Sequence, residues 1–202
     1  MEIFVDGIPQ EISLDGGETV GDVVGSVSKT LDTKKRIVKV VLNGENITGV
    51  SQKHLDPALQ SMRIEIVTGF AKELATESLE SISEFHASLL KEFKRSAEEF
   101  RMGSFEASSN ILANCIDGLQ ILMKTTMSVT SLLQIAPENI SAGEMNLAET
   151  VVKIAEVLEE MIQAQTNHDG ILIADLIEYE ITPLVEDWGI ALDTMKNAGV
   201  TA

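Results

Sequence analysis

Hydrophobic and polar residues follow two different periods along the chain, and the change falls near residue 69. Before that point apolar and polar residues alternate, most cleanly at 63–67, which is the period of a strand with one buried face. From residue 71 onward the apolar residues recur every three or four positions, which is the period of an amphipathic helix. The pattern predicts an α+β protein, with a strand-rich domain at 1–69 and an all-α domain at 70–202.

The first domain is predicted to contain two strands, a helix, a strand, a short strand and a last strand. The Asp-Gly pair at 6–7 and the Asn-Gly pair at 43–44 favour two-residue hairpin turns, because such turns need positive φ at both central residues. Thr19 and Asp22 have the spacing of a capping box, so we expect the helix to begin after Thr19.

This segment resembles ubiquitin-like β-grasp domains over about a third of the chain. Residues 1–5 are similar to the first strand of that family, 40–47 to the turn after its third strand, and 63–67 to its last strand. The resemblance implies a β-grasp fold that docks other proteins through its exposed sheet face. Modifier and sulfur-carrier members end in a free Gly-Gly tail, whereas here the chain continues through Thr68-Gly69-Phe70, which disfavours those roles.

Three residues match the apolar docking patch of the ubiquitin-like family by their position: Ile8, Val41 and Val67. They are therefore candidate partner-binding residues. The alternative is that they fill the packing between the sheet and the helical part of the chain. The sequence leaves both interpretations open.

About four helices are predicted in the second domain, and local signals mark their ends. Gly103 is expected to end the first helix and Ser104 to cap the second. The segment 136–139, which contains a proline, should separate the second helix from the third. Residues 141–144 have the spacing of a capping box for the third helix, and Asp169 is placed to cap the last.

Pro183 lies inside the predicted last helix. Proline removes one helical hydrogen bond and clashes with the preceding turn, so we expect a kink or a break near Glu180. Amphipathic helices joined by short connections favour an antiparallel bundle. The first two helices are longer than a compact bundle of this size needs, so we expect some of their apolar length to pair with a second copy in a homodimer.

The charge of the chain restricts its partners. Asp and Glu number 32 against 15 Lys and Arg, a net charge of −17. Residues 1–69 carry ten acidic and seven basic residues, so most of the excess lies in the helical domain. Nucleic acids and anionic membranes need basic surfaces, so neither is an expected partner. A basic or amphipathic helical protein is the partner that this charge favours.

The acidic excess is concentrated toward the C-terminus, where no Lys or Arg occurs between Lys153 and Lys196. This region supplies the other candidate partner-binding residues. They are Glu156, Glu159, Glu160, Asp175, Glu178, Tyr179 and Asp187. The alternative is an acidic face that only keeps the protein in solution.

Little in the sequence indicates chemistry. Cys115, the single cysteine, falls on the apolar stripe of its helix, so a buried structural thiol is expected. The three histidines at 54, 86 and 168 form no metal-binding spacing, and no phosphate loop or nucleophile elbow occurs. We therefore expect no catalytic, cofactor or metal site. The N-terminus resembles no signal peptide and no apolar run is long enough to span a membrane, so a cytoplasmic location is expected.

These observations favour a non-catalytic protein–protein interaction protein, either an adaptor or a chaperone-like protein for export or assembly. Small acidic helical chaperones of bacterial flagellar and secretion systems are similar in size and charge. Two alternatives stay open. One is an enzyme or carrier that holds a small molecule or metal in a pocket of the helical bundle, and the other is a purely structural homodimer.

Overall fold

The computed structural model describes residues 2–11, 19–32, 34–48 and 62–201, with no side chain described beyond residue 198. The chain divides into two compact units, Met1–Leu74 and Ala75–Ala202. A turn expected from the sequence at 15–17, an irregular stretch expected at 49–61 and the histidine at 54 lie outside the described residues. Within the described part, no helix is both long enough and apolar enough to cross a membrane.

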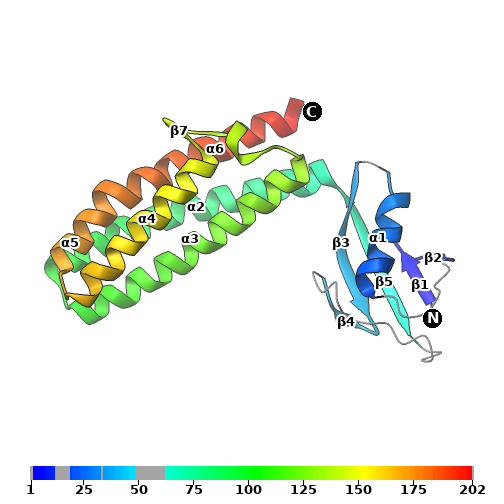
Figure 1. Ribbon diagram of the computed structural model, residues 1–202, viewed down its shortest axis with the longest axis horizontal. Coiled ribbons are helices and arrows are strands. Elements are labelled where there is room, and N and C mark those ends of the chain that lie inside the picture. The colour runs from blue at the N-terminus through cyan, green and yellow to red at the C-terminus, as the bar shows by residue number, and fades with distance from the viewer. Residues whose placement is uncertain (1, 12–18, 33, 49–61, 202) are drawn as a thin grey trace. The chain divides into compact units, whose positions relative to one another are not determined.

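The first unit is a mixed β-sheet with one helix (Figure 1). Its elements are β1 (Glu2–Val5), β2 (Ile8–Gln10), α1 (Val20–Thr30), β3 (Lys35–Leu42), β4 (Glu45–Asn46) and β5 (Arg63–Phe70). The strand order is β2-β1-β5-β3-β4. β1 and β5 run parallel, and the other neighbouring strands run antiparallel. The predicted order of elements and the α+β class are confirmed.

The predicted turns and the first cap are confirmed in their backbone geometry. Asp6 and Gly7 have φ of 51° and 79°, and Asn43 and Gly44 have φ of 50° and 87°, as a hairpin turn of this kind requires. The Thr19 side chain accepts from the backbone N–H of the third helical residue, whose carboxylate accepts from the N–H of Thr19 in return. Local sequence therefore fixes both hairpins and the start of α1.

One face of this sheet is packed against α1. The strands contribute alternate residues to a core that also takes the apolar stripe of the helix. The fully or nearly buried members are Ile3, Val20, Val23, Val27, Val40, Leu42, Ile47, Met62, Ile64 and Ile66. The intervening residues of β1, β3 and β5 lie on the opposite face, because successive side chains of a strand point to opposite sides.

The second unit is helical, and its long helices run side by side (Figure 1). The elements are α2 (Ala71–Met102), α3 (Phe105–Leu133), η1 (Pro137–Asn139), β6 (Ser141–Ala142), β7 (Met145–Asn146), α4 (Leu147–Thr166), α5 (Gly170–Asp175), η2 (Leu176–Ile181) and α6 (Thr182–Thr201). Segments α5, η2 and α6 follow one another without a break and form the fourth rod. The predicted helical region of about four packed helices is confirmed.

Two of the predicted helix caps in this unit are confirmed and one is wrong. Ser104 caps α3 and Asp169 caps α5 through side-chain oxygens that accept backbone N–H groups. Residues 141–144 do not form a capping box. They belong to the β6–β7 hairpin, whose turn contains Gly143 at a φ of 67°. The capping box of α4 is made instead by Asn146 and Glu149, with both hydrogen bonds at 3.0 Å.

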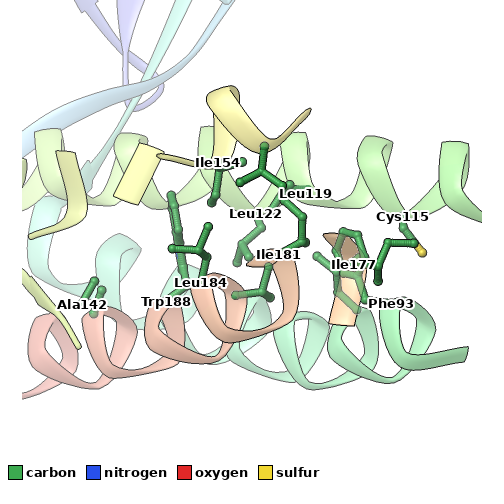
Figure 2. Packing of buried hydrophobic residues seen from close by; sticks show 14 of the residues in the cluster. Phe93, Cys115, Leu119, Leu122, Ala142, Ile154, Ile177, Ile181, Leu184 and Trp188 are labelled. Carbon is green, nitrogen blue, oxygen red and sulfur yellow. The ribbon is translucent and has the colours of Figure 1, made fainter. Parts of the chain in front are cut away.

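The core of the helical unit is contributed by all four rods (Figure 2). Trp188 is fully buried in it, in helical register with the buried Leu184 and Leu192. The other members of this core come from α2, α3, α4, η2 and α6. They include Phe93, Leu119, Leu122, Ile154, Ile177, Ile181 and Leu184.

Pro183 is accommodated by a π-helical turn. The segment η2 ends immediately before α6, and the backbone N–H of Thr182 donates to the carbonyl of Ile177, an i→i−5 bond. The sequence led us to expect a kink or break near Glu180, and the structure has this π-helical turn there. A wider turn makes room for a proline ring that would clash in a regular α-helix.

Candidate functional site

An acidic face with exposed apolar residues runs along the outside of α4. Val152, Glu156, Glu159 and Gln163 are all exposed and recur at intervals of four, three and four residues, so they form one stripe of the helix. Glu160 and Ile162 are exposed on opposite sides of this stripe. We call Val152, Glu156, Glu159, Glu160 and Ile162 the α4 face.

The α4 face combines exposed apolar side chains with exposed carboxylates. The exposed fractions of Val152 and Ile162 are 59% and 64%, which is high for branched apolar side chains. Glu156 lies 3.7 Å from Lys153 within the same helix. Glu159 and Glu160 form no ion pair with any residue that the structure describes. The face therefore offers apolar side chains next to carboxylates that are open to a cationic partner.

Two other candidates, Asp175 and Glu178, are already engaged with a cation. Both accept hydrogen bonds from the Arg101 guanidinium of α2, and the Asp175 bond measures 2.8 Å. These two carboxylates raise the pKa of Arg101 above its usual range. Asp175 and Glu178 thus join the α5–η2 part of the fourth rod to α2. Their role in the structure is to hold these two rods together.

Tyr179 and Asp187 lie in different surroundings. Tyr179 is 65% exposed and belongs to the π-helical turn. Asp187 is half-buried, and a Cβ atom on Gly143 would lie only 2.3 Å from its Oδ2 atom. The carboxylate of Asp187 thus packs against the β6–β7 turn. The structure does not bring Asp187 onto the α4 face.

On the N-terminal unit, the sheet register separates the three patch candidates. Ile8 lies opposite Val5, and Val5 pairs with Ile66, so Ile8 is on the side of the sheet that carries the buried Ile66. Val67 follows Ile66 and lies on the other side, together with Val41. The exposed fractions of Ile8 and Val67 are 62% and 43%. Val41 and Val67 share a face, and Ile8 does not join them.

Phe4 is a residue of this open sheet face that the sequence interpretation missed. It lies opposite Glu65, which in turn lies opposite Val41, so the three side chains share one face. The Arg63 guanidinium lies 4.3 Å from the Phe4 ring centroid, and Arg63 also pairs with Glu65 at 2.7 Å. The strand alternation could have identified Phe4.

A groove between two rods of the helical unit was also missed. It has a volume of about 410 Å³ and lies between α2 and the junction of η2 with α6. Its lining residues are Lys94, Ala97, Glu98, Arg101, Glu178, Thr182, Pro183 and Glu186. The signal in the sequence was Pro183, because irregular helical turns of this kind are frequent at functional sites.

The remaining reactive side chains show structural roles. Cys115 is buried, as predicted, and burial raises the pKa of its thiol to about 11. The Nε2 atom of His86 lies 2.6 Å from the backbone carbonyl of Val185, where it joins α2 to α6. Among the described residues, no group of three or more His, Cys, Asp or Glu side chains is arranged to hold a metal ion.

Two domain-family models match the chain, one in each unit. Residues 1–70 match the model of the TP0873 N-terminal domain. No curated protein and no solved structure matches the chain. Residues 77–191, more than half of the chain, match the model described as Domain of unknown function (DUF8042). The chain therefore belongs to the DUF8042 family.

Proposed function

We propose that this protein is a non-catalytic binding protein, an adaptor or chaperone-like protein, whose α4 face docks a basic amphipathic helix of a partner protein. The observation that carries the proposal is the stripe on α4. Exposed Val152 shares this stripe with Glu156 and Glu159, and Ile162 and Glu160 lie on its two flanks. An amphipathic helix with lysines or arginines beside its apolar stripe would match both kinds of residue.

The charge of the whole chain supports this kind of partner. A net charge of −17 draws basic proteins toward the surface and raises their association rate. The same charge disfavours nucleic acids and anionic membranes. Carboxylates that pair with a cation of another rod, such as Glu178 with Arg101, take no part in the proposed docking.

The N-terminal unit supports the proposal as a second docking module of β-grasp type. The parallel pairing of β1 with β5 at the centre of the sheet, with one helix across a face, is what the resemblance to ubiquitin-like domains implies. Its open face combines Phe4, Val41 and Val67 with Arg63. Such a face suits a partner surface that is less basic than the one expected at α4.

The test uses a fluorescently labelled synthetic peptide built of leucine and lysine at helical spacing. Its affinity is measured by anisotropy at low salt for the natural chain and for the triple variant E156K/E159K/E160K. The matched control is E77K/E80K/E84K, which reverses three exposed carboxylates on α2. Both variants change the net charge equally, so only the position of the charges differs.

The α4 variant should bind the peptide at least about ten-fold more weakly, because several ion pairs of up to about 1 kcal/mol each become repulsions. The α2 control should weaken binding much less, and added salt should weaken all binding. Equal losses in the two variants would mean that the peptide senses only total charge, and the proposed site would be wrong. Unchanged binding in both variants would favour the alternative that the protein is a purely structural homodimer.

A further inference from the structure

One exposed stripe of α3 carries an apolar residue between two opposite charges. Asp117, Ile121 and Lys124 follow one another at intervals of four and three residues and are all exposed, so they lie on one side of the helix. We call these three residues the α3 stripe. The exposed fraction of Ile121 is 53%, and neither Asp117 nor Lys124 forms an ion pair with any residue that the structure describes. The stripe therefore has an apolar centre and two charges that are open to a partner.

The α3 stripe borders an apolar groove between α2 and α3. The groove has a volume of about 460 Å³, and its lining includes Phe85, Asp117, Gly118 and Ile121. A Cβ atom on Gly118 would lie 3.4 Å from the Cζ atom of Phe85. The half-buried ring of Phe85 thus reaches the turn of α3 that also carries Ile121. The two side chains provide adjacent apolar surface that an apolar side chain of a partner could contact.

α3 is also the long helix of this unit with the fewest charged residues. They are Glu106, Asp117 and Lys124 in a length of 29 residues, whereas residues 147–201 carry 11 acidic and two basic residues. Two copies of a chain with a net charge of −17 repel each other strongly wherever acidic faces meet. A second copy would meet much less repulsion at α3 than at the last two rods.

The order of the charges along the α3 stripe is self-complementary. Asp117 lies four residues before Ile121 and Lys124 lies three residues after it, which is about one helical turn on each side. When two such helices pack antiparallel with Ile121 at their crossing, Asp117 of each copy faces Lys124 of the other. A two-fold axis produces both pairs at once, because an isologous interface repeats every contact in both directions. A parallel pairing in the same register would instead place like charges together.

We infer that the α3 stripe is an isologous interface with a second copy of the chain. Two α3 helices pack antiparallel through Ile121, with Phe85 of each copy beside this contact, and Asp117 of each copy forms an ion pair with Lys124 of the other. This interface would account for the homodimer that the lengths of the first two helices led us to expect. The inference does not rest on the proposed function, because the α3 stripe shares no residue with the α4 face.

Sedimentation equilibrium of the full chain at physiological salt measures the association. The natural chain should show a reversible monomer–dimer equilibrium, because the interface is small. I121D should weaken the dimer at least about ten-fold, because it brings two carboxylates together at the two-fold axis. The matched control is I190D, which makes the same change at an apolar residue of α6 that is 46% exposed. I190D should associate as the natural chain does.

Charge reversal tests the antiparallel register. D117K and K124D should each weaken the dimer about ten-fold, because like charges then face each other on both sides of the axis. D117K lowers the net negative charge of the chain, which by itself would favour association, so a weaker dimer in this variant cannot come from total charge. The double variant D117K/K124D restores both ion pairs and should associate as tightly as the natural chain. An equimolar mixture of D117K and K124D should form a heterodimer.

Circular dichroism should show that all the variants fold, because every substituted position is exposed. The inference is overturned if the natural chain stays monomeric at concentrations up to about 1 mM. It is equally overturned if I121D associates as tightly as I190D, or if D117K/K124D does not recover the dimer that D117K loses.

Discussion

The indole Nε1–H of Trp188 donates a hydrogen bond to the Oγ1 atom of Thr126 at 3.0 Å, and both side chains are fully buried. Thr126 in turn donates its hydroxyl proton to the carbonyl of Leu122 at 2.7 Å. This short relay satisfies every polar atom of the two side chains within the core. It joins α6 to α3 at one register, since an indole displaced along the helix would lose its acceptor.

The relay predicts that T126V destabilises the helical unit. The substitution keeps the shape of the side chain but leaves the buried indole N–H of Trp188 without an acceptor. The free energy of unfolding should fall by about 1–3 kcal/mol. Urea denaturation followed by the fluorescence of Trp188 measures it. An unchanged midpoint would show that the indole hydrogen bond contributes nothing.

T182V should have the opposite effect on stability. Its hydroxyl is buried without a partner among the described residues, so the exchange for a methyl group removes a desolvated polar atom. We expect the free energy of unfolding to stay equal or to rise by about 1 kcal/mol. The same urea denaturation measures it, with T126V as the matched comparison. A loss as large as that of T126V would mean that the Thr182 hydroxyl is satisfied after all.

The contact between Gly143 and Asp187 predicts a strong coupling between these positions. G143A places a methyl group at positive φ and 2.3 Å from the Asp187 Oδ2 atom, so it should cost at least about 2 kcal/mol of unfolding free energy. In a D187A background the clash is gone and only the backbone strain of about 1–2 kcal/mol remains. Equal costs of G143A in both backgrounds, measured by thermal unfolding, would contradict the contact.

Burial of Cys115 predicts a slow thiol. Its pKa of about 11 follows mainly from desolvation, with a smaller contribution from Glu92, so very little thiolate forms at mildly alkaline pH. Ellman's reagent should react with the folded protein far more slowly than with the urea-unfolded chain. Similar rates for the two states would show that the thiol is accessible.

Asp6 gives the N-terminal unit a dependence on acid. Its carboxylate accepts hydrogen bonds from the hydroxyl and the backbone N–H of Thr68, and these lower its pKa below 3.8. A lowered pKa in the folded state adds stability above 3.8, and that stability is lost as the pH falls through the folded pKa. D6N should therefore be less stable at neutral pH.

The difference between D6N and the natural chain should shrink in acid. Hydrogen exchange of the β5 amides, read at neutral pH and again below 3.8, follows the N-terminal unit, which contains no tryptophan. The turn geometry is preserved in the variant because asparagine tolerates positive φ. A difference that stays constant across this range would assign the effect to the turn and not to the charge.

Local signals in the sequence predicted much of the fold, and the errors have physical causes. Two-residue turns and caps depend on a few adjacent residues, so Asp6-Gly7 and Thr19 were sufficient. At 141–144 the same kind of signal misled, because Gly143 could adopt the left-handed conformation that a hairpin needs. Residues 141–144 could form either a capping box or a hairpin. The hairpin is favoured because β6 and Gly143 pack against α6.

The candidate site was harder to predict. Ile8 was grouped with Val67 only because of its position in the ubiquitin-like family. The two-residue turn at 6–7 fixes the pairing of Ile8 with Val5. The side of the sheet on which Ile8 lies could therefore have been predicted from the sequence. The pairing of Arg101 with Asp175 and Glu178 joins distant parts of the chain, so no local pattern could show which carboxylates stay open.

The central claim is that the α4 face is where a basic amphipathic helix docks, and NMR mapping of the leucine–lysine peptide on the full chain tests it most directly. We predict that the largest amide shifts fall on α4 around Val152, Glu156, Glu159 and Ile162, and that they are reduced at higher salt. Shifts centred on α2, or spread evenly over all exposed carboxylates, would contradict the claim.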